Sequence, residues 1–116
     1  DSVITGDKDL ILQNSNKIEL TEHLFDKDAL IFPNVKSNYV ILNEKKAGKH
    51  IRFTFSDSPF LAIWAKPAAP FVCIEPWYGV NDSYEKATDF SKKRGIQKLS
   101  SGEKFEFSWS AEFKED

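Results

Sequence analysis

The chain of 116 residues is 41% hydrophobic and 29% charged, a composition typical of one folded globular domain and not of a disordered segment. Its formal net charge of −2 at pH 7 gives no electrostatic drive toward nucleic acid or an anionic membrane, so neither is an expected partner. No apolar stretch approaches the roughly 20 residues that a membrane-spanning helix requires.

The first strands are predicted from short apolar runs in the N-terminal third of the chain. Residues 3–4 and 10–12 are candidates, and residues 29–32 form a further one that Pro33-Asn34 closes. Each run is too short for a helix, so these segments predict strands.

Two runs in the middle of the chain predict a β-hairpin. Residues 38–43 and 49–55 lie on either side of the turn residues Ala47-Gly48, and the second run alternates apolar and polar residues. Such alternation is typical of a strand with one buried face.

Two further apolar strands are predicted at residues 61–64 and 71–75. Residues 82–93 are polar and poor in aromatic side chains, which predicts a loop with a helical turn near residues 84–88.

The C-terminal segment has the clearest alternation. Its apolar parity is Phe105, Phe107, Trp109, Ala111 and Phe113, so residues 104–113 predict a long, half-buried antiparallel strand. Seven or eight short strands with little helix predict an all-β fold, an antiparallel β-sandwich.

Glu75 is the main candidate for chemistry. It ends the apolar run 71–75 and precedes Pro76, which we expect to stop the strand and hold the carboxylate at its end. Both faces of the run are predicted to be buried, where an unpaired charge is costly. A carboxylate in such a place suits a general base acting on a sugar. The alternative is a structural glutamate bonded to the backbone or to Arg52.

Aromatic and polar residues follow Glu75 at once. Trp77, Tyr78 and Asp82 could bind a sugar, because aromatic faces stack on pyranose rings and carboxylates accept from hydroxyls. The alternative is that the two rings fasten a loop to the core. Asp28, before the strand 29–32, is a second candidate ligand, although the sequence pattern alone favours a turn residue that caps the bend at residues 25–27.

Cysteine and histidine usage predicts neither a disulfide nor a metal site. Cys73 is the single cysteine, so we expect a reducing, cytoplasmic compartment. His23 and His50 have no metal-ligand spacing to each other or to Cys73. The chain contains no methionine and therefore does not begin at its own initiator.

The run 71–79, with Asp82 beyond it, resembles the C-terminal region of aldose 1-epimerases, which are galactose mutarotase-like proteins. Three shorter segments, residues 28–32, 60–64 and 95–103, agree with the resemblance in order. Together they cover about residues 25–113. The family is about twice this length or more, so residues 1–116 would be a single β-sandwich region, the C-terminal part of a larger sandwich.

The resemblance implies an isomerase that exchanges the α and β anomers of an aldohexose without a cofactor. Glu75 would be the general base that removes the proton of the anomeric hydroxyl, and Asp28 would bind a sugar hydroxyl. In the family a histidine from the N-terminal half acts as the general acid. His23 and His50 do not match that motif, so we expect the N-terminal half of the same protein as a partner and an isolated chain without activity. A non-catalytic carbohydrate-binding sandwich and a structural or regulatory domain are the alternatives.

Overall fold

The computed structural model describes residues 9–83 and 89–115. The candidate strand 3–4 and the helical turn predicted near residues 84–88 lie outside these ranges. The described residues form the strands β1 (Leu30–Pro33), β2 (Tyr39–Asn43), β3 (Lys49–Phe55), β4 (Phe60–Trp64), β5 (Cys73–Trp77) and β6 (Trp109–Glu115), with the 3₁₀ turn η1 (Phe90–Lys92). They contain no α-helix.

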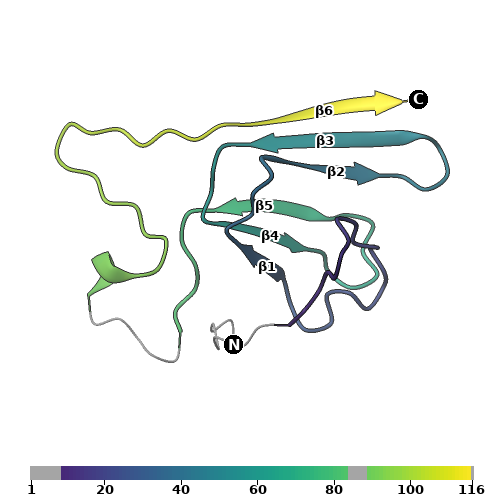
Figure 1. Cartoon of the computed structure of the whole chain (residues 1–116), viewed down its shortest axis with the longest axis horizontal. Coiled ribbons are helices and arrows are strands. Elements are labelled where there is room, and N and C mark those ends of the chain that lie inside the picture. The colour runs from purple at the N-terminus through teal and green to yellow at the C-terminus, as the bar shows by residue number, and fades with distance from the viewer. Residues whose placement is uncertain (1–8, 84–88, 116) are drawn as a thin grey trace.

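The six strands form two three-stranded antiparallel sheets, which Figure 1 shows one above the other. One sheet has the order β1-β4-β5 and the other β2-β3-β6. The predicted all-β class and the antiparallel pairing are confirmed, and the two small sheets give a fold of the β-sandwich type. Membership of a larger sandwich stays a prediction.

The sheet β1-β4-β5 carries half of the core. The described hydrophobic residues that are buried are Phe25, Phe55, Phe60, Leu61, Ala62 and Ala65, and three of them belong to β4, its central strand. Burial on both faces explains why β4 is uniformly apolar, as the central strand of a covered sheet must be. In β5 every residue is half-buried.

The sheet β2-β3-β6 is built on the predicted hairpin. β2 and β3 pair from Tyr39↔Thr54 to Asn43↔His50, and the turn between them contains Gly48 at φ +62°. The chain leaves β5, passes η1 and returns as β6 along the outer side of β3. This confirms the predicted strands 38–43 and 49–55.

Three sequence predictions need correction. Residues 10–12 form no strand, and Leu10 is largely exposed. The C-terminal strand begins at Trp109 and extends to Glu115, so Phe105 and Phe107 precede it. Its apolar side chains are also less covered than a half-buried strand requires, with Trp109 61% and Phe113 75% exposed.

Pro76 does not end the strand that carries Glu75. β5 continues through Pro76, which pairs with Leu61, to Trp77, which pairs with Phe60. A proline is tolerated there because β5 has a neighbour on one side only among the described strands, so the missing N–H can lie on the outer side. Glu75 therefore lies in the middle of β5 and not at its end.

Candidate functional site

Glu75 and Trp77 are hydrogen-bonded on one face of β5. The two residues are two positions apart, so their side chains lie on the same face of the strand. The indole Nε1 of Trp77 donates to Glu75 Oε2 at 3.0 Å, and both residues are half-buried. The predicted burial of both faces around Glu75 is thus corrected: Glu75 is half-buried, and the Trp77 indole is one of its partners.

The face around Glu75 is completed by β4. Ala62 is the cross-strand neighbour of Glu75, and Phe60 is that of Trp77. Ala62 has no exposed surface and Phe60 is 4% exposed. Alanine is small, so β4 presents only a methyl group to Glu75 across the strand pair.

Cys73 lies on the other side of Glu75 along β5. Burial raises the pKa of the Cys73 thiol, and the negative charge of Glu75 and a hydrogen bond between the two side chains raise it further. The thiol therefore stays protonated at neutral pH, which fits an inert, half-buried cysteine and not a nucleophile.

A shallow open hollow of about 390 Å³ adjoins the end of β5. It is lined by consecutive residues, from Pro76 and Trp77 to Val80 and Asn81. Glu75 is not part of its lining, but Trp77 is and also bonds the carboxylate. Trp77 therefore both bonds the candidate base and lines the hollow.

Tyr78 is held by the C-terminal segment. Its ring meets Phe105 edge-on with 4.9 Å between centroids, and Phe107 lies at 5.7 Å. Burial and, to a smaller degree, the charge of Asp57 raise the pKa of the Tyr78 hydroxyl. These contacts show that Tyr78 fastens its loop to residues 105–107.

The two predicted aspartate ligands have partners of their own. Asp82 is exposed and forms an ion pair of 2.7 Å with Lys93 Nζ. Asp28 is an exposed turn residue with φ +89°, and its Oδ1 accepts from the Ala29 backbone N–H. It precedes β1, which lies on the other side of β4 from β5.

Arg52 belongs to the other sheet, where its guanidinium lies 4.1 Å from the centre of the Tyr39 ring. Arg52 is therefore not the partner of Glu75, while the interpretation of Glu75 as a structural glutamate stays an alternative.

A different arginine, Arg94, lies near the Trp77 end of the site. Its guanidinium is 4.9 Å from the centre of the Phe60 ring. The neighbouring Gly95 has φ +76°, and a Cβ at that position would stand 2.9 Å from the Phe60 ring. Arg94 was not among the predicted site residues, and Gly95 entered only through the family resemblance. A glycine can signal that the backbone passes close to a side chain, as it does here to the Phe60 ring.

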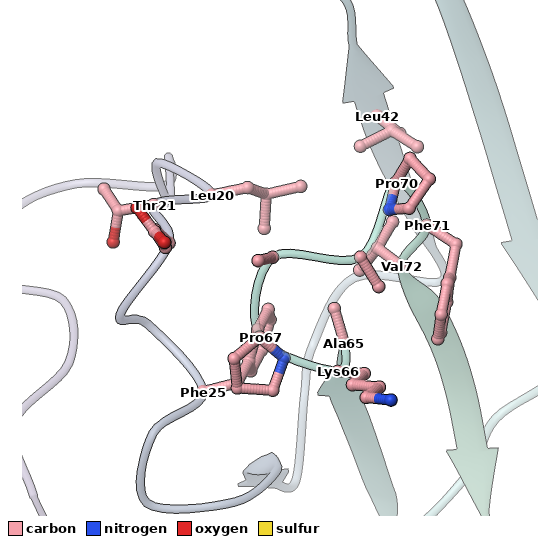
Figure 2. A pocket seen from close by; sticks show the side chains of 13 residues that line it. Leu20, Thr21, Phe25, Leu42, Ala65, Lys66, Pro67, Pro70, Phe71 and Val72 are labelled. Carbon is pink, nitrogen blue, oxygen red and sulfur yellow. The ribbon is translucent and has the colours of Figure 1, made fainter.

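A second hollow, of about 350 Å³, lies where the loop between β4 and β5 meets the segment before β1 (Figure 2). Its walls are mostly apolar, with Leu20, Phe25, Leu42, Pro67 and Phe71 among them. None of the predicted site residues lines it.

Residues 9–83 and 89–115 contain no helix that is long and apolar enough to cross a membrane. They also contain no cluster of three or more histidine, cysteine or acidic side chains that could hold a metal ion.

The chain is similar to two curated proteins, the plasmid and the chromosomal forms of protein LacX from Lactococcus lactis subsp. lactis. It is 33% identical to each over 94 residues, which is 80% of this chain and 31% of the relative. The chain thus spans about a third of the length of the curated relatives it matches. No protein-family model and no solved structure matches it.

Proposed function

We propose that this chain contributes the general base of a carbohydrate isomerase that interconverts the α and β anomers of an aldohexose, as part of a longer cytoplasmic protein. The observation that carries the proposal is a half-covered carboxylate, Glu75, bonded to the indole of Trp77, a residue that also lines an open hollow. The resemblance of residues 71–79 to aldose 1-epimerases supplies the reaction. The LacX proteins support it by matching 80% of the chain while being about three times as long as the matched part.

In the proposed reaction, Glu75 accepts the proton of the anomeric hydroxyl. The bond between the anomeric carbon and the ring oxygen breaks, and a general acid protonates that oxygen. Closure on either face of the resulting carbonyl, with both proton transfers reversed, gives either anomer. No net oxidation occurs and no cofactor is consumed.

The general acid is proposed to come from the N-terminal half of the same protein. His23 is bonded to Asp26 at the surface, and His50 lies on β3 in the other sheet. Neither histidine belongs to the strand that carries Glu75 or to its neighbour β4. The isolated chain is therefore expected to be inactive.

The same N-terminal half is the proposed cover for the apolar side of β6. Trp109 and Phe113 pair with Phe55 and Ile51 of β3, so they extend the apolar face of that sheet beyond the part that is covered. Exposed aromatic area of this kind marks an interaction surface. The length of the LacX relatives outside the matched segment supplies a source for the covering strands.

The sugar is proposed to lie over the hollow beside Trp77 and Tyr78, with Asp28 and Asp82 as hydroxyl ligands. The two rings support stacking on the C–H face of a pyranose. Asp28 and Asp82 are both exposed. Their assignment as sugar ligands rests on the family resemblance and on the sequence pattern.

The test is anomer exchange by the full-length protein, measured by polarimetry or by exchange NMR of α- and β-hexoses. Glu75→Gln should reduce the rate by about 10²-fold or more, the usual contribution of a general base, with the fold unchanged. Glu112→Gln is a matched control, because Glu112 is an exposed carboxylate on β6. Undiminished exchange in Glu75→Gln would exclude the assignment.

A non-catalytic carbohydrate-binding sandwich is the second candidate. The shallowness of the hollow at Trp77 and the pairing of Glu75 with an indole favour it. Calorimetric titration of the full-length protein with the same hexoses separates the two functions. Heat of binding without anomer exchange would support the binding module over the isomerase.

A further inference from the structure

We infer that Trp77 is a positioning residue for Glu75: its indole N–H binds Oε2 of the carboxylate and fixes the orientation in which the carboxylate meets the proton. The inference rests on the proposed function of Glu75 as a base and assigns to Trp77 a role other than sugar stacking.

The chemistry of the bond selects the oxygen. An indole N–H can only donate, and a hydrogen bond to an ionised carboxylate is stronger than one between neutral groups. Trp77 Nε1 lies 3.0 Å from Glu75 Oε2. A protonated Oε2 would be a weaker acceptor for the indole N–H, so this bond disfavours a proton on Oε2.

The surroundings hold the indole in place. Pro76, between the two residues, fixes its own backbone φ near −65° and so limits motion within the Glu75–Trp77 segment. Across the sheet, Trp77 faces Phe60, which is 4% exposed and contacted by Arg94 and the turn at Gly95. A side chain supported in this way gives the carboxylate a defined geometry before substrate arrives.

Stacking and positioning need different parts of the indole. Stacking uses the ring face, which phenylalanine retains, whereas positioning uses the Nε1 hydrogen, which phenylalanine lacks. Trp77→Phe therefore separates the roles. In the full-length protein it should lower kcat about tenfold, the loss of one hydrogen bond to a charged group, while KM changes by less than about twofold.

Trp64→Phe is the matched control. Trp64 is also half-buried, stands on β4 opposite Cys73, and packs against Phe71 rather than against Glu75. This variant should retain wild-type kcat and KM. An unchanged kcat in Trp77→Phe, or a change confined to KM, would overturn the positioning role.

A spectroscopic measurement tests the bond without activity. In full-length protein labelled with ¹⁵N-tryptophan, the Trp77 indole proton should resonate downfield, and Glu75→Gln should move it upfield while the Trp64 and Trp109 signals stay. An indole signal indifferent to Glu75→Gln would overturn the inference even if the enzyme is active. If the signal moves but the protein exchanges no anomers, the bond is supported and the proposed isomerase fails.

Discussion

β5 and β6 are both edge strands of three-stranded sheets among the described residues, yet they differ in how much surrounds them. Every residue of β5 is half-buried, including Glu75. In β6 all residues except Ala111 are exposed, including Trp109 and Phe113. The strand that carries the candidate base is thus better covered than the strand that carries Trp109 and Phe113.

The neighbours of the two strands explain the difference. β5 lies beside β4, whose first three residues are buried, and the turn at Gly95 closes over Phe60. β6 lies beside β3, and beyond it no further described strand continues the sheet. Alternation along a strand fixes which face is apolar. Whether that face is buried depends on what lies over it, which is a property of the whole assembly.

The largest test of this contrast compares a core leucine with an exposed phenylalanine. Leu61→Ala should lower the free energy of unfolding of the 116-residue chain by about 2–5 kcal/mol, because Leu61 is 3% exposed. Phe113→Ala should change it by no more than about 0.5 kcal/mol, because the side chain is 75% exposed. Urea denaturation followed by circular dichroism measures both.

The same pair of variants in the full-length protein sharpens the contrast. If the N-terminal half covers β6, Phe113→Ala should there cost about 3–5 kcal/mol, as for a buried phenylalanine, while the Leu61→Ala value stays the same. Equal, small effects of Phe113→Ala in both proteins would show that nothing covers this face.

A second, smaller effect tests the closure over β4. Gly95→Ala should destabilise the chain by about 1–3 kcal/mol, because alanine is strained at φ +76° and its Cβ would lie 2.9 Å from Phe60. Gly102→Ala is the control: Gly102 has φ +84° but open space around it. In thermal melting curves, Gly95→Ala should lower the midpoint temperature more than Gly102→Ala does, because only the Cβ at position 95 would clash with Phe60. Equal shifts would mean that the turn does not press on Phe60.

The smallest expected effect is on the alkylation rate of Cys73, which reports how well β5 is covered. Because burial first and the charge of Glu75 second raise the pKa of the Cys73 thiol, iodoacetamide should alkylate Cys73 more slowly at pH 8 than it alkylates a cysteine peptide. Glu75→Gln should speed the reaction only partly, since burial remains.

The sign of the linked stability follows from the raised pKa. The stability that the neutral Cys73 thiol contributes is fully present below the unfolded thiol's pKa and is lost as pH rises through the higher folded value. Urea titrations between pH 7 and 10 should therefore show stability falling at the alkaline end, less so in Cys73→Ala. An alkylation rate equal to that of the peptide would show β5 to be open.

The strands were largely predictable because local pattern determines them. Residues 38–43, 49–55 and 61–64 became β2, β3 and β4 with shifts of about one residue. The errors arose where local rules meet tertiary context. Pro76 was expected to end a strand, but an edge strand accepts proline.

The candidate site was predictable in its residues but not in their contacts. If the strand continues through Pro76, the alternation of side chains places Glu75 and Trp77 on the same face. The sequence does not show that the indole bonds the carboxylate. Nor does it show that Arg94 lies over Phe60, because that contact joins segments more than 30 residues apart. The sugar-binding roles of Asp28, Tyr78 and Asp82 stay predictions.

Pro76 also influences how copies of this chain could associate. A proline in the middle of β5 removes one backbone donor from the outer edge, so a foreign strand cannot add there with a complete ladder. β6 has no proline between Trp109 and Glu115. Sheet extension, and with it fibre growth or aggregation, is therefore expected to start at the sheet β2-β3-β6, whose edge strands β2 and β6 contain no proline, and to spare the edge that bears Glu75.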